Sequence, residues 1–82
     1  MEPDLLERQL ALVERQIARA EQHVAIRRDI ITYLEAVGRG RSETAEFARD
    51  VLRFTENNLR ARMAERKRFQ RQLHRSKYPT AA

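Results

Sequence analysis

The chain of 82 residues has no cysteine and no tryptophan, and it has only two glycines and two prolines. Without cysteine it forms no disulfide, and two histidines are too few ligands for a structural zinc site. No apolar run approaches the roughly 20 residues that a membrane-spanning helix needs, and the acidic first residues are unlike a signal peptide. We therefore predict a cytoplasmic protein with no membrane partner, no metal and no cofactor.

Hydrophobic residues make up 41% of the chain and charged residues 35%, a composition typical of amphipathic helices. A chain of this length has room for one small domain, predicted to span residues 1–82. Below roughly 70–80 residues a fold usually depends on disulfides, a metal or a partner molecule. Since neither a disulfide nor a metal is predicted, the composition favours a helical fold that another protein surface completes.

Proline and glycine, which interrupt helices, lie at the ends and the centre of the sequence. Pro3 and Pro79 are near the termini, and Gly38 and Gly40 are central. Neither long segment between these positions contains a helix-breaking residue. The predicted elements are therefore a first helix over about 4–37, a turn at 38–41, a second helix over about 42–75 and a frayed tail at 76–82.

The residues at the predicted helix ends are of types that commonly terminate helices. Asp4 can bind the open amides of the first turn and Glu7 can reach back toward it, which is the capping-box arrangement. Gly38 is suited to the left-handed conformation that follows many helices. Ser42 is the expected cap of the second helix, because its hydroxyl can accept a hydrogen bond from the next turn.

Apolar residues in both predicted helices recur at alternating steps of three and four, the spacing of a coiled-coil seam. In the first helix the seam positions are Leu6, Leu10, Val13, Ile17, Ala20, Val24, Arg27, Ile31 and Leu34. In the second helix they are Ala45, Ala48, Leu52, Thr55, Leu59, Arg62, Arg66, Phe69 and Leu73. When the chain folds back between residues 39 and 40, the two sets face one another in pairs whose residue numbers sum to 79. We therefore predict an all-α antiparallel two-helix hairpin.

Three arginines interrupt the apolar seam. Their aliphatic stems can be buried there while their guanidinium groups reach carboxylates on the other helix. The expected partners are Asp50 or Glu56 for Arg27, and Glu14 for Arg62 and Arg66. Half-exposed pairs of this kind are each worth less than about 1 kcal/mol, but together they favour the antiparallel arrangement.

Apolar residues outside the seam would remain exposed in a lone hairpin. They are Leu5, Leu12, Ile26 and Tyr33 beside the first seam, Phe47, Val51 and Phe54 beside the second, and Ile30 and Val37 further round the first helix. Leaving four or five such side chains in water costs roughly 1.5–3 kcal/mol each, comparable to the stability of a small domain. The simplest solution is a second copy of the chain, which gives a homodimeric four-helix bundle. In that bundle Ile30 and Val37 either complete the core or form a separate docking patch. A different protein with a complementary helix or groove would cover the same residues equally well.

Positive charge is concentrated in the last third of the chain. Residues 56–82 carry eight Arg or Lys against two Glu, whereas residues 1–55 carry nine Arg against ten Asp or Glu. A basic stripe is expected on the outer face of the second helix, formed by Arg60, Lys67, Arg68, Arg71 and Arg75. Such a stripe can lie along nucleic-acid phosphates, but no Asn or Gln is placed to read bases, which favours solvated structural charge. Of the 17 basic residues 15 are Arg, a bias that either phosphate contacts or a GC-rich genome would produce.

No arrangement of residues in the sequence indicates catalysis. There is no cysteine nucleophile, no Ser-His-Asp set and no glycine-rich phosphate loop before a helix. The predicted function is a non-enzymatic helical interaction or assembly module, an adaptor or scaffold, with no small-molecule substrate. The alternative is a helical hairpin that binds the RNA or DNA backbone without sequence preference through the basic half of its second helix.

Overall fold

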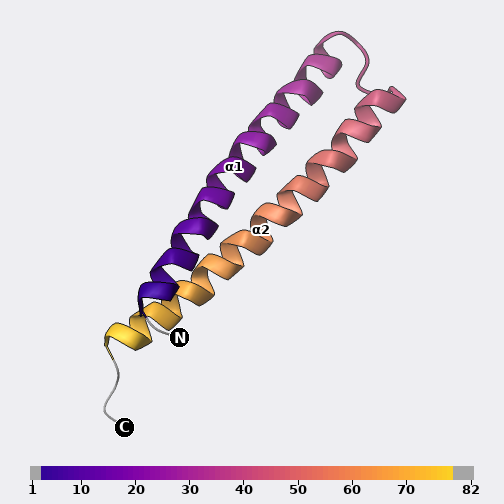
Figure 1. The fold of residues 1–82 in the computed structure, drawn as a ribbon. Helices are drawn as coiled ribbons and strands as arrows, with labels where there is room; N and C mark the ends of the chain where they lie inside the picture. The colour runs from indigo at the N-terminus through magenta and orange to yellow at the C-terminus, as the bar shows by residue number, and fades with distance from the viewer. Residues whose placement is uncertain (1–2, 79–82) are drawn as a thin grey trace.

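A computed structural model describes residues 3–78, which form two long helices that lie side by side (Figure 1). Helix α1 spans Pro3–Ala36 and helix α2 spans Glu43–Lys77. The helices run in opposite directions, so the turn occupies one end of a rod that measures 62 × 20 × 15 Å. The predicted all-α antiparallel hairpin is confirmed. Neither helix of the described segment combines the length and the apolar character needed to cross a membrane.

The turn begins where Gly38 takes the left-handed conformation, with φ of +77°. The Gly38 N–H donates to the Glu35 carbonyl at 3.1 Å, and the Arg39 N–H donates to the Leu34 carbonyl at 2.7 Å. This pair of hydrogen bonds is the Schellman motif, which satisfies carbonyls that the last turn of a helix leaves without a partner. Gly38 therefore ends α1 as the sequence predicts.

Helix α2 starts at the expected cap. The Ser42 backbone is extended, its Oγ accepts a hydrogen bond from the Ala45 N–H at 3.1 Å, and the same hydroxyl donates to the Arg39 carbonyl at 2.7 Å. Glu43 and Glu46 follow in the first turn, where the helix dipole favours negative charge. One serine thus joins the end of the turn to the start of the helix.

The start of α1 differs from the prediction. The helix already includes Pro3, whose fixed φ and missing N–H are tolerated in a first turn. Asp4 therefore lies within the first turn and not at the cap position, and its carboxylate is 4.0 Å from the Arg8 guanidinium. A carboxylate there still stabilises the helix through its dipole.

The end of α2 also differs from the prediction, because Ser76 and Lys77 are helical where a frayed tail was expected. The Tyr78 N–H donates to the His74 carbonyl at 2.8 Å and closes the final turn. Lys77 is further held by the Glu7 carboxylate at 3.1 Å. The rest of the predicted tail, residues 79–82, lies outside the described residues.

The core is the seam between the two helices. On α1 the buried residues are Leu6, Val13, Ile17, Val24, Ile31 and Leu34, with Leu6 only 1% exposed. On α2 only Ala45 and Thr55 are buried, and most other seam residues are half-buried. The buried Thr55 hydroxyl donates to the Val51 carbonyl at 2.8 Å, so its polar group is satisfied within the helix. The seam therefore covers one narrow stripe of each helix.

Among residues 3–78, three ion pairs join the two helices. They are Glu7–Lys77 at 3.1 Å, Arg28–Glu56 at 2.9 Å and Glu35–Arg49 at 3.7 Å. The residue numbers of each pair sum to 84. Each α1 member directly follows a seam residue. The residue predicted to face that seam residue lies on α2, and the α2 member of the ion pair comes four residues after it. The pairs thus confirm the predicted register near the open end, in the middle and beside the turn.

The partners expected for the seam arginines are wrong. Glu56 pairs with Arg28, while Arg27 reaches only the His23 carbonyl of its own helix, at 3.4 Å. A residue one step outside the seam points along the flank of the hairpin, where a charged side chain can reach across without desolvation. Arg27 lies inside the seam and cannot follow the same path.

Asp50 and Arg62, which were expected to pair across the helices, form local pairs instead. Asp50 pairs with Arg53 one turn away, and Arg62 pairs with Glu65 at 3.8 Å. No pair between Glu14 and a seam arginine occurs among residues 3–78. Pairs three residues apart within a helix form readily, because the helix backbone already holds the two side chains beside one another.

The Gly38→Ala variant is expected to unfold with a free energy about 1 kcal/mol lower than the parent, because an L side chain at positive φ is strained. A Cβ at this position would meet no atom within 4 Å, so the loss isolates backbone strain from steric conflict. Urea denaturation followed by circular dichroism measures it. Gly38→Asn is the matched control and is expected to lose less, since Asn tolerates the left-handed region. Equal stability of the alanine variant and the parent would contradict this account of the turn.

Candidate interaction surface

The two flanks of the seam carry different side chains. One flank holds the three interhelical ion pairs, and we call it the charged flank. Among the described residues its exposed large apolar side chain is Met63, at 39%. The opposite flank is apolar near the turn and is the candidate interaction surface.

A groove runs between the helices on this opposite flank, in the half of the hairpin nearest the turn. Its lining is apolar apart from one threonine hydroxyl and one arginine, and comprises Ile26, Arg27, Ile30, Thr44, Phe47, Ala48 and Val51. The groove continues past Tyr33 toward the turn, where Asp29 also lines it, and past Phe54 in the other direction. We call the surface formed by Ile26, Ile30, Tyr33, Phe47, Val51 and Phe54 the groove face.

The aromatic residues of the groove face are mostly exposed. Phe47 is 70% exposed, Phe54 68% and Tyr33 65%. A whole aromatic side chain offers roughly 150–250 Å², so these three together expose on the order of 300–500 Å². Monomeric soluble proteins rarely expose larger contiguous apolar patches than a few hundred Å². With the neighbouring isoleucines added, the groove face exceeds what a solvated surface normally carries.

Ile30 lies closer to the seam than the sequence prediction placed it. It is 46% exposed and shares the groove with Ile26. The reason is geometric: Ile30 comes three residues after Arg27 and four before Leu34, so it stands directly beside two seam positions. Val37, 49% exposed, is beyond the end of α1 and does not line the groove.

The structure separates Leu5 and Leu12 from the other residues of the predicted interface. They are 44% and 43% exposed and lie toward the open end of α1. They belong to the same seven-residue line as Ile26 and Tyr33, but Arg19 occupies the position between. At that level polar side chains enter the surface between the helices, among them Gln16, Arg19, His23, Asn58 and Arg62, beside the apolar Ala20, Val51 and Phe54.

Arg27 stands at the boundary between the apolar groove and this polar stretch. It lines both, and its side chain is only partly exposed. Its Nε is buried and has no hydrogen-bond partner among residues 3–78. Leaving a buried charged donor without a partner costs free energy, and the charge interrupts the apolar surface at this point.

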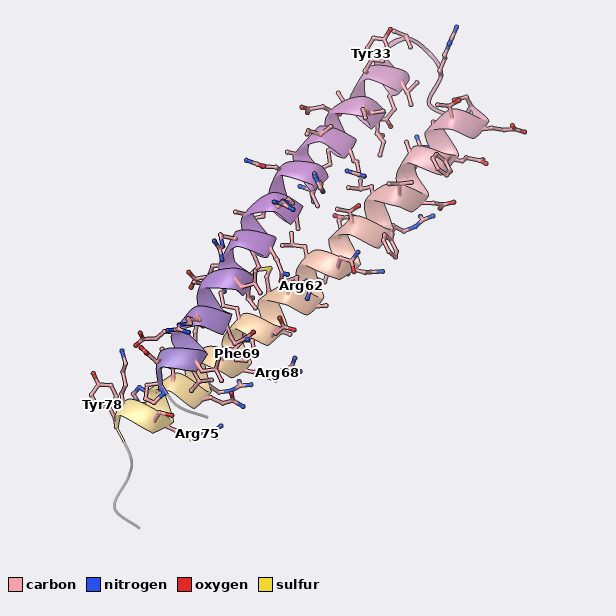
Figure 2. The ribbon with its side chains drawn as sticks, viewed as in Figure 1. Tyr33, Arg62, Arg68, Phe69, Arg75 and Tyr78 are labelled. Carbon is pink, nitrogen blue, oxygen red and sulfur yellow. The ribbon has the colours of Figure 1, made fainter. Side chains whose placement is uncertain are left out.

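The predicted basic stripe lies on α2 at the open end of the rod. Its five members, Arg60, Lys67, Arg68, Arg71 and Arg75, are all exposed. None of them forms an ion pair with a carboxylate of residues 3–78, and Arg60 donates only to the Asn57 amide oxygen at 2.9 Å. Figure 2 shows two of the arginines, Arg68 and Arg75, at the end opposite Tyr33.

Two rings extend the basic stripe toward the end of α2. His74 and Tyr78 lie with their ring centroids 5.1 Å apart and tilted by 42°. His74 also lines a shallow depression with Lys67, Arg71 and Arg75. His74 is not among the residues predicted for the stripe, although it lies four residues before Tyr78, the residue that directly follows α2, and this spacing brings the two rings together.

No family model, curated protein or solved structure matches the chain.

The Arg27→Leu variant is expected to raise the free energy of unfolding by about 1 kcal/mol or more, because it removes the unpartnered buried Nε and adds apolar contact to the seam. Arg28→Leu is the matched control: it breaks the exposed pair with Glu56 and is expected to change stability by only about 0.5 kcal/mol. Both are measured by urea denaturation at one protein concentration. A less stable Arg27→Leu variant would show that this arginine has a stabilising partner.

Proposed function

We propose that the chain is a cytoplasmic, non-enzymatic assembly module, an adaptor or scaffold, whose hairpins associate through the groove face to form a homodimeric four-helix bundle. The observation that carries this proposal is the set of six neighbouring apolar side chains on one flank near the turn. They come from both helices, so a partner that covers them touches the whole width of the rod.

Hydrophobic energetics support association over a solitary hairpin. Covering a Val, Leu, Ile or Phe side chain contributes roughly 1.5–3 kcal/mol, and the groove face offers six exposed or half-exposed apolar residues. The total rivals the 5–15 kcal/mol by which a typical domain is stable. The seam of a two-helix protein leaves no other place to bury them, because each helix has already used its one stripe.

The charged flank is a poor surface for association by comparison. Its ion pairs are already formed within one hairpin, and their side chains remain partly hydrated. Burying them would cost the desolvation of several charges, which the remaining contacts do not offset. The comparison of the two flanks thus supports association through the groove face.

The test is a pair of charge substitutions on the same helix. Phe54→Asp is expected to weaken self-association roughly 100-fold or more, because two-fold symmetry removes the aromatic contact twice, at about 1.5–3 kcal/mol each. Met63→Asp places the same charge on the charged flank and is expected to leave the association constant within a few-fold. Sedimentation equilibrium measures both, with circular dichroism to establish that each variant remains helical.

A parent chain that stays helical and monomeric at micromolar concentration would contradict the proposal. Equal weakening by both substitutions would show that association does not use the groove face.

The unpaired basic stripe supports a second candidate function, binding of the RNA or DNA backbone. Five exposed cations without carboxylate partners, with the His74 and Tyr78 rings beside them, form a surface on which phosphates can be contacted and a base can stack. Gln70 lines the same depression as Lys67, Arg71 and His74, but a single amide gives little discrimination between bases, so this binding would depend mainly on the backbone and little on sequence.

Salt dependence tests the second candidate. If four phosphates are contacted, affinity for a mixed-sequence single strand is expected to fall about 50-fold between 50 and 200 mM salt, at roughly 0.7 ions released per contact. Arg71→Glu is expected to weaken binding strongly, whereas Arg15→Glu, an equal charge change at an exposed position of α1, is expected to have little effect. Fluorescence anisotropy measures both. Equal effects would indicate non-directional charge attraction and remove the stripe as a site.

A further inference from the structure

The groove face is apolar along only part of the rod. On α2, steps of seven residues lead from Phe47 and Phe54 through Ala61 to Arg68 and Arg75, all on one line of the helix. The same line therefore starts with aromatic residues beside the turn and ends with arginines at the open end. Figure 2 shows this polarity, with Tyr33 at one end and Arg68 and Arg75 at the other.

The change in character along α2 restricts how a second copy can be placed. If the copies overlapped along their full length in opposite directions, the phenylalanines of each would cover Arg68 and Arg75 of the other. If they lay in the same direction, apolar residues would meet, but the arginines of both copies would meet as well. A third arrangement overlaps only the halves beside the turns, with the open ends pointing away from each other.

We propose that two copies associate in this third way, as a staggered antiparallel dimer in which only the halves beside the turns overlap. The inference rests on the proposed assembly through the groove face and adds its geometry. It places a second copy of the chain on the apolar groove and leaves both basic stripes free, at opposite tips of an elongated particle.

Electrostatics favour the staggered arrangement. Residues 56–82 carry eight basic and two acidic residues, a net charge of +6 in each copy. Charges within a Debye length of one another, about 8–10 Å at physiological salt, repel with little screening. In a side-by-side dimer whose copies run in the same direction, facing helices lie roughly 8–10 Å apart, so the two basic ends would repel, whereas staggering separates them by most of the particle length.

The groove face is also complementary to itself under this symmetry. A two-fold axis perpendicular to the helices pairs Phe47 with Phe54 of the second copy when it crosses α2 midway between residues 50 and 51. The same kind of axis pairs Ile26 with Tyr33 of the second copy when it crosses α1 midway between residues 29 and 30. Because the numbers of facing residues sum to 79, the crossing point on α2 faces a point midway between residues 28 and 29 of α1. The two crossing points therefore differ by about one residue along the rod, roughly 1.5 Å. One axis therefore satisfies both pairings, as an isologous contact requires.

The contact area is sufficient for a dimer. The three aromatic side chains expose on the order of 300–500 Å², and Ile26, Ile30 and Val51 lie between them. Together they approach the roughly 800 Å² per partner that specific interfaces bury. Overlap beyond the halves beside the turns would add charged surface and little apolar surface.

Distances between single spin labels on the two copies distinguish the arrangements. The chain has no cysteine, so Arg8→Cys and Gln22→Cys each give one label, at exposed positions two heptads apart on the same outer line of α1. Arg8 lies about 21 residues from the proposed axis and Gln22 about 7, or roughly 32 and 11 Å. Dipolar spectroscopy is therefore expected to give at least about 60 Å between Arg8 labels and a distance about 30 Å shorter between Gln22 labels.

Small-angle scattering provides a measurement that needs no substitution. Each turn extends about 10 residues, roughly 15 Å, beyond the axis, so two rods of 62 Å that overlap by about 30 Å form a particle about 95 Å long. A dimer about 62 Å long with equal distances for the two label sites would overturn the staggered arrangement but leave the proposed assembly standing. A dimer with Arg8 labels closer than about 50 Å and a site difference about half as large would also overturn it, in favour of full antiparallel overlap. A monomer at the same concentrations would overturn both.

Discussion

The constraint on which this structure depends is that two helices in contact can bury only one stripe each. The seam of α1 and α2 uses that stripe, with Leu6, Val13 and Ile17 almost completely covered. Long helices rich in apolar residues leave more such side chains than one stripe can hold. The surplus lies on the flanks, and the distribution of charge decides which flank remains apolar. Everything inferred about assembly follows from that surplus.

The two flanks differ in what they contribute to one hairpin. Interhelical ion pairs on the charged flank hold the register along the whole rod, and each contributes little by itself because it is exposed to water. The groove face contributes nothing to register within one hairpin, since its aromatic side chains are about two-thirds exposed. It therefore remains available to a partner. Arg27 marks its limit, where an unpartnered Nε interrupts the apolar surface.

Much of the hairpin could be predicted from the sequence because its determinants are local. Gly38 and Ser42 end and begin the helices through bonds within one turn of themselves. The heptad spacing fixed the register, since facing positions follow once the turn is placed. The helix ends were less predictable: Pro3 is helical and Asp4 does not cap, because several residues compete for each terminus at similar energies.

The sequence by itself determined the antiparallel hairpin, its register and the concentration of positive charge toward its open end. Only the tertiary structure decided which side chains meet outside the seam. It paired Arg28 with Glu56 where Arg27 was expected, joined Ile30 to Ile26 in one groove, and separated Leu12 from that groove by a polar stretch. The physical reason is that a heptad gives the angle of a residue around its own helix, whereas a flank contact also depends on the neighbouring helix and on side-chain length.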